Sequence, residues 1–185
     1  MHRCAVLFII ALVGIAPGRA AAQAAAPPPQ HPAVDVNKAA LDAAAKIGLA
    51  ALKPGVSVSD RNIAISDSGS HNVTVAFVTR PATKTPSGRT LSHDKITEIY
   101  YVLRGSGTAV TGTLVNGTKE SGSATIGPGW SSPDPLKDGR TVKLGPGEIQ
   151  IIPPGLGHVW TEIADGGIDY LVFRVDPEHV LGLSK

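Results

Sequence analysis

The chain has 185 residues, of which 42% are hydrophobic and 17% charged, and its formal net charge is +2 at pH 7. This length allows one compact core and is too short for two comfortable domains. The small net charge gives no electrostatic reason to expect nucleic acid or an anionic membrane as a partner.

Residues 1–24 have the order of a secretory signal peptide. A basic start is followed by an apolar run from Cys4 to Ala16 and by small residues that fit cleavage after Ala22 or Ala24. The run is shorter than the roughly 18 to 20 apolar residues that span a bilayer, which argues against a stable membrane anchor. We therefore expect a periplasmic or secreted protein.

Cleavage would also change the charge and the thiol content. Removing Arg3 and Arg19 from the 17 basic residues leaves 15, against 15 acidic residues. The only cysteine, Cys4, is removed as well. The mature chain is then neutral and has neither a disulfide nor thiol chemistry, even in an oxidising compartment.

The next two segments are a linker and a helix. Residues 25–35 are rich in Pro and Ala and predict a flexible linker. Residues 36–52 have an Ala-rich helical composition, with Asp35 or Asn37 available as the N-cap and a stop signal from Lys53 to Gly55.

From residue 56 onwards the sequence predicts β-structure. Eight short runs are rich in Val, Ile, Thr and aromatic residues: 56–66, 71–80, 97–105, 107–115, 141–145, 148–153, 158–164 and 168–175. Eight short strands joined only by turns predict an antiparallel sandwich or barrel. The Gly/Pro/Ser-rich connection 119–140 is long enough for a functional lid or a disordered excursion.

Two polar residues stand in the stretch "SHDKITEIYYVLRGSG", residues 92–107. If Asp94 and Lys95 make a turn, His93 ends one strand and Glu98 begins the next, so both side chains can enter one cavity. The period of two then places one face of the second strand inward. That face consists of Glu98, Tyr100, Val102 and Arg104.

A second stretch, "GPGEIQIIPPGLGHVW" at residues 145–160, has the same character. A strand ends at Ile152, a Gly/Pro turn reverses the chain, and His158 opens the next strand. By the same period, His158, Trp160 and Glu162 share a face. Two histidines and a carboxylate at the ends of strands are a ligand set for a divalent metal with open coordination positions.

These two stretches resemble the two motifs of the cupins. In the first motif, His93, Glu98 and Gly105 stand where the family has its second histidine, its glutamate and its closing glycine. The second motif is matched in full by Gly147, Pro153, Gly155 and His158. The resemblance implies an all-β, single-domain cupin, which is a double-stranded β-helix or jelly-roll barrel, over residues 36–185 with its core at 56–176 and an N-terminal helix.

The sequence departs from the family pattern at Leu91, which stands in place of the first histidine. The resemblance therefore implies the reduced ligand set of His93, Glu98 and His158. This set matches the facial triad of non-haem iron proteins, so iron is favoured, with Mn, Zn, Ni or Co as alternatives. Some cupins have lost their metal, but three ionisable side chains are costly to bury in an apolar barrel without a partner.

Three further residues have two possible roles each. Glu162 could act as a general base beside the metal or be a solvated carboxylate at a strand end. Tyr100 and Trp160 could form the wall of a pocket that recognises a substrate, or be ordinary core residues.

The function that the resemblance implies is a metal-dependent enzyme acting on a small organic molecule, with dioxygenase-type chemistry favoured over isomerase or lyase chemistry. The alternative is a non-catalytic periplasmic cupin that binds or senses a ligand. Barrels of this family often pair, so a homodimer is expected. The apolar outward faces of "IYYVL" and "YLVFRV" are compatible with such an interface.

Overall fold

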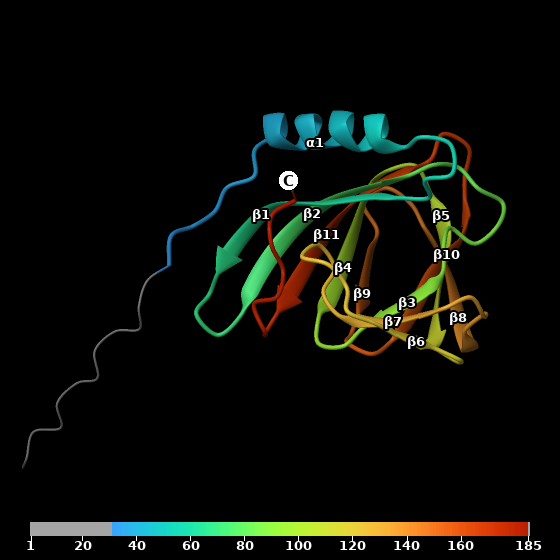
Figure 1. The fold of residues 1–185 in the computed structure, drawn as a ribbon. Coiled ribbons are helices and arrows are strands. Elements are labelled where there is room, and N and C mark those ends of the chain that lie inside the picture. The colour runs from blue at the N-terminus through green and yellow to red at the C-terminus, as the bar shows by residue number, and fades with distance from the viewer. Residues whose placement is uncertain (1–30, 185) are drawn as a thin grey trace, which may run out of the picture.

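The structure of the chain, a computed structural model, describes residues 31–184 (Figure 1). The predicted signal peptide and the first part of the predicted linker lie outside these residues. Within residues 31–184, no helix is long and apolar enough to cross a membrane.

The predicted helix is confirmed as α1, Lys38–Ala51. Asn37 is its N-cap, because its side-chain oxygen accepts a hydrogen bond from the Ala40 backbone N–H at 2.9 Å. The helix lies across the outer face of one sheet (Figure 1), where Ala44 packs with Phe77 and Leu171.

The rest of the described chain forms two antiparallel sheets. Their strands are β1 (Ser59–Asp67), β2 (Asn72–Arg80), β3 (Thr90–His93), β4 (Thr97–Arg104), β5 (Gly107–Thr113), β6 (Thr118–Glu120), β7 (Gly129–Ser132), β8 (Lys137–Leu144), β9 (Ile149–Ile152), β10 (Gly157–Ile163) and β11 (Ile168–Asp176). One sheet has the order β1-β2-β11-β4-β9, and the other has the order β6-β7-β3-β10-β5-β8. Neighbours are mostly distant in sequence, as in a jelly roll.

All eight predicted strands are present, and three more belong to the second sheet. The connection 119–140 is not a structureless excursion, because it contains β7 and the start of β8. The segment "GWSS" of β7 lacks the β-branched residues that mark a strand, and it is held by pairing with β3 and β6. This pairing is long-range and leaves no trace in local composition.

The core lies between the two sheets. Along β11, Ile168, Tyr170, Val172 and Arg174 are buried between the sheets, whereas Leu171 on the opposite face packs under α1. On β4, Glu98, Tyr100 and Val102 are buried, as their alternation predicts. The largest apolar cluster gathers at one part of this interior, and polar side chains gather at another.

Candidate metal centre

Three strands bring the predicted ligands together. His93 is the last residue of β3, Glu98 is the second residue of β4, and His158 is the second residue of β10. One possible ligand atom from each residue lies within 4.8 Å of the others, and all three side chains are buried. The two histidines come from one sheet and the glutamate from the other, so the cluster lies between the sheets.

The imidazole rings face the carboxylate. Nε2 of His93 is 3.5 Å from Oε1 of Glu98, and Nε2 of His158 is 3.5 Å from Oε2. Nδ1 of His158 lies 3.2 Å from the carbonyl oxygen of Leu156. In the tautomer with the proton on Nδ1, this nitrogen donates to that oxygen and Nε2 keeps a free lone pair. That tautomer is the one a metal needs.

Burial and neighbouring charges set the protonation of the cluster. Burial raises the pKa of Glu98, but the charge of Arg174 and the contact with His93 outweigh it and hold this pKa well below its usual value. Burial lowers the pKa of His158 to about 4, against the opposing effect of Glu98. At neutral pH the cluster therefore presents an ionised carboxylate and a neutral imidazole at position 158, as metal binding requires.

Arg174 is a partner of Glu98 that the sequence analysis missed. It is directly opposite Glu98 in the pairing of β4 with β11, and its Nε donates to Oε1 at 2.8 Å. Its terminal nitrogens donate to Asp60 at 3.1 and 2.5 Å and to Asn62 at 2.8 Å. The alternation in "IDYLVFRV" places this arginine on the buried face, which was an available but unused signal.

The residues present fit a divalent ion. Each oxygen of Glu98 has one protein donor, Arg174 on Oε1 and the Tyr100 hydroxyl on Oε2 at 3.0 Å. A carboxylate oxygen has two acceptor positions, so each retains one for a metal. A cavity of about 30 Å³ lies against the cluster, which exceeds the space that one water needs. Hydrogen-bonded carboxylate ligands of this kind are usual in metal sites.

Leu91 stands at the position where the cupin motif that the sequence resembles has a histidine. Leu91 is opposite His158 in the pairing of β3 with β10, and it lines the cavity at the cluster. An aliphatic side chain cannot bind a metal. The protein ligands in the described chain therefore number three.

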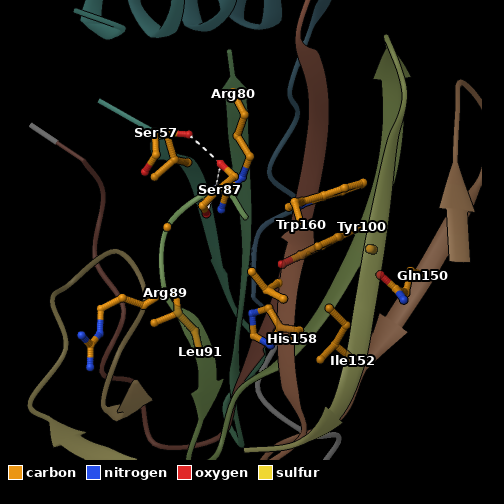
Figure 2. A pocket seen from close by; sticks show the side chains of 14 residues that line it. Ser57, Arg80, Ser87, Arg89, Leu91, Tyr100, Gln150, Ile152, His158 and Trp160 are labelled. Atoms are coloured by element: carbon orange, nitrogen blue, oxygen red, sulfur yellow. Dashed lines mark hydrogen bonds between the residues drawn. The ribbon is translucent and has the colours of Figure 1, made fainter. Parts of the chain in front are cut away.

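A larger cavity of about 220 Å³ adjoins the cluster. Figure 2 shows His158, Leu91 and Ile152 at one end, and Arg80 with Ser87 at the other. Tyr100 and Trp160 both line it, with nearly parallel rings whose centroids are 6.2 Å apart. Both are also buried core residues, so the two roles are compatible.

The prediction that Glu162 shares the inward face of His158 is wrong. The pairing of β10 with β5 shifts register between Trp160 and Glu162, so the alternation is interrupted there. Glu162 is consequently exposed and pairs with Lys84 at 3.1 Å, while Ile163 is fully buried. A bulge inside a strand has no reliable signature in a single sequence.

Comparisons with known proteins found matches among solved structures only. No protein-family model and no curated protein matches the sequence. Among solved structures, vicilin from Corylus avellana (hazelnut) is 16% identical, with a TM-score of 0.39 over 56% of this chain, and this chain covers 24% of vicilin. A Bacillus halodurans protein is 12% identical, with a TM-score of 0.47, covering 82% of this chain and 87% of that one. A cupin protein from Bacteroides fragilis is 18% identical, with a TM-score of 0.35, covering 62% and 73%.

At these identities the similarities assign no activity to the chain. Its own features define the class: two antiparallel sheets in jelly-roll order, the two motif spacings, and buried His93, Glu98 and His158 converging between the sheets. The chain has a cupin fold.

Proposed function

We propose that the chain is a metal-dependent enzyme that acts on a small organic molecule inside the barrel. The observation that carries this proposal is that two cavities share lining residues. One lies beside His93, Glu98 and His158, and the other is larger, mainly apolar and also lined by His158. A metal that served only structure would not need an adjoining space of about 220 Å³.

The protein side chains have separate tasks in this proposal. His93, Glu98 and His158 would hold the ion, which supplies Lewis-acid or oxygen-activating chemistry when bound. Arg174 and the Tyr100 hydroxyl fix the orientation of the Glu98 carboxylate. The apolar walls of the larger cavity keep water away from a bound molecule and orient it.

Iron and dioxygenase-type chemistry suit three protein ligands with open coordination positions. Isomerase and lyase reactions on Mn, Zn, Ni or Co are the alternatives within the same class. Fold alone does not select among them.

A non-catalytic binding or sensing protein is the second candidate. It is favoured by the outward position of Glu162, which removes the predicted general base from the cluster. Among the described residues that line the two cavities, the only carboxylates are Glu98 and Asp60, and both accept hydrogen bonds from Arg174. An enzyme would then need a proton donor or acceptor of another kind.

Elemental analysis of protein purified without chelator tests the metal. We expect about one equivalent of a transition metal in the wild type and little in His93→Gln or His158→Gln, because each change removes one of the three ligands that residues 31–184 supply. His71→Gln is the matched control, because His71 lies immediately before β2, contacts Ser70 and is outside the cluster. A folded wild type that stays empty after anaerobic reconstitution would refute the metalloenzyme.

We also propose that the protein is exported, as the composition of residues 1–24 suggests. Expression of the whole chain in a Gram-negative host, followed by fractionation and intact-mass measurement, tests this. A periplasmic product shortened by 22 or 24 residues is expected, whereas a full-length cytoplasmic product would contradict it.

A further inference from the structure

We propose that Arg80 and Tyr170 form an anion-binding subsite beside the metal-binding cluster, and that the molecule held in the barrel is a small carboxylate. The inference rests on the proposed function in one respect: the bound acid would be the molecule on which the proposed enzyme acts. Its physical basis is independent of the metal, because it consists of two hydrogen-bond donors inside the barrel that lack acceptors.

Arg80 carries a charge in the barrel without a carboxylate partner. Its Nε donates to the Tyr170 hydroxyl at 2.9 Å, and its Nη1 donates to the backbone and side-chain oxygens of Ser87 at 3.2 and 3.1 Å. Within residues 31–184, Nη2 has no acceptor and no carboxylate lies within ion-pair distance of the guanidinium. Neutral partners alone do not balance the charge of this half-buried guanidinium.

Arg174 gives the contrast within the same interior. Its guanidinium pairs with Glu98 at 2.8 Å and with Asp60 at 2.5 Å, so its charge is balanced by carboxylates of the chain. Arg80 forms three hydrogen bonds, but all of them are to oxygens that carry no charge. The difference indicates that the guanidinium of Arg80 is available to pair with an anionic ligand, whereas that of Arg174 is not.

Tyr170 adds a second donor at the same place. Its oxygen accepts from Arg80 Nε and from Trp160 Nε1, the latter at 3.3 Å. Both of these contacts use the oxygen as acceptor, so the hydroxyl hydrogen still needs an acceptor of its own. Among the described residues it has none, although Tyr170 is only 1% exposed.

Both groups are placed to act on one ligand. Arg80 lines the larger cavity and also the small cavity at the cluster, and Tyr170 lines the small one. Figure 2 shows the Arg80 side chain running down beside Ser87 at the end of the cavity opposite Ile152. An anion bound by Arg80 and Tyr170 would therefore lie near the open side of His93, Glu98 and His158.

A carboxylate fits these donors better than a phosphate does. A guanidinium edge and a hydroxyl match the two coplanar oxygens of a carboxylate. Phosphate has more charge to neutralise than this single cation supplies. The cavity of about 220 Å³ is below the usual range of roughly 300 to 1,000 Å³ for ligand pockets, which limits the molecule to a small acid.

The test uses the indole N–H of Trp160 as a reporter, because it donates directly to the Tyr170 hydroxyl. The chain has two tryptophans, so a ¹⁵N-labelled sample gives two indole signals, and Trp130→Phe assigns them. Acetate and benzoate are titrated into zinc-loaded and metal-free protein, with acetamide and benzamide as neutral isosteres. We expect both acids to move the Trp160 signal, the amides to move it at least tenfold less at equal concentration, and the exposed Trp130 to stay unchanged.

Variants separate the subsite from the fold. Arg80→Gln should weaken acetate and benzoate binding at least tenfold, and Tyr170→Phe should weaken it several-fold while leaving the ring in place. Arg104→Gln is the control, because that arginine pairs with Asp169 at the surface and should leave binding unchanged. Circular dichroism checks that each variant is folded.

The outcomes distinguish this subsite from the proposed metal. Acid-selective shifts that depend on Arg80 but occur without metal support the subsite even if no metal binds. A protein that binds metal but responds equally to acids and amides overturns the subsite and leaves the metal proposal intact. Inorganic phosphate that binds more tightly than acetate would overturn the assignment to carboxylates.

Discussion

Arg174 is a buried cation that pairs with two carboxylates. It is 1% exposed and donates to Glu98, Asp60 and Asn62, so it joins β11 to β4 and β1. Loss of one partner from a buried ion pair is strongly destabilising, because the remaining charges stay buried without compensation. The arginine therefore supports the folded state as well as the orientation of Glu98.

We predict that Arg174→Met lowers the free energy of unfolding by about 3 to 5 kcal/mol, because it leaves Glu98 and Asp60 without their cation. Arg104→Met should change it by no more than about 1 kcal/mol, since the pair with Asp169 is largely exposed on the arginine side. Urea unfolding of metal-free protein measures both. Equal small losses in the two variants would contradict the structural role of Arg174.

The metal-free protein should also lose stability in mild acid because of His158. Its pKa is about 4 in the folded chain, below the ordinary 6.5, so the unfolded chain binds its proton more readily. The contribution of neutral His158 to the free energy of unfolding is fully present above pH 6.5 and is lost as the pH falls towards 4. The carboxylate of Glu98, whose folded pKa is also lowered, adds its loss only below its ordinary value of 4.5.

Urea unfolding with chelator at pH 7, 6 and 5 checks this prediction. The free energy of unfolding of the wild type should fall steadily from pH 7 to pH 5. That of His158→Gln should fall less, because glutamine at this position does not titrate in that range. Parallel pH profiles for the two proteins would show that His158 is not the group responsible.

At the scale of elements, two glycine turns position the cluster in different ways. Gly105 begins the turn between β4 and β5 at φ +73°, and a Cβ there would lie 2.0 Å from the Gly167 carbonyl oxygen. Gly155 lies before β10 at φ +77°, where a Cβ would meet nothing within 4 Å, and its N–H donates to the His93 carbonyl oxygen at 2.7 Å. Only the first turn combines a left-handed backbone with a steric block.

We predict that Gly155→Ala costs about 1 to 2 kcal/mol of folding free energy, the usual cost of a left-handed alanine. Gly105→Ala should cost more than about 3 kcal/mol, because the β4–β5 turn must also move away from Gly167. Thermal and urea unfolding of the two variants test the order. A Gly105 variant as stable as the Gly155 variant would mean that the two turns are not packed as described.

The elements that sequence reasoning found are those with a local signal. The alternation in β4 correctly places Glu98 and Tyr100 inside, and the Gly/Pro turn correctly delivers His158 to the same cavity. Glu162 was misplaced because a bulge reverses the alternation, and β7 was missed because it is defined by pairing rather than by composition. Arg174 was accessible from its strand pattern, but its partner Asp60 lies more than a hundred residues away.

For the whole molecule, the outer face of the first sheet is covered over only part of its width. The outward residues of "YLVFRV" pack under α1, so that half of the expected dimer interface is not available. The β4 and β9 end remains open, and β9 is an edge strand. Its exposed apolar patch consists of Tyr101, Leu103, Ile149 and Ile151, with the two isoleucines 60% and 64% exposed.

We predict that the protein is a homodimer through this patch, because adjacent exposed apolar side chains on an edge strand favour association. Ile151→Lys should shift the mass measured by light scattering after gel filtration from dimer to monomer. Ile47→Lys, on an exposed part of α1, should leave the dimer intact. A monomeric wild type at micromolar concentration would contradict the interface.

The charges around the small cavity have a consequence for the order in which ligands enter. Two carboxylates, Glu98 and Asp60, and two guanidinium groups, Arg174 and Arg80, line the small cavity, so these four formal charges sum to zero. A divalent cation would leave two positive charges in excess, and an organic acid would remove part of that excess. Cation and acid should therefore each raise the affinity for the other by the same factor. The metal-loaded site should therefore bind small acids more tightly than the metal-free site does, although both bind them.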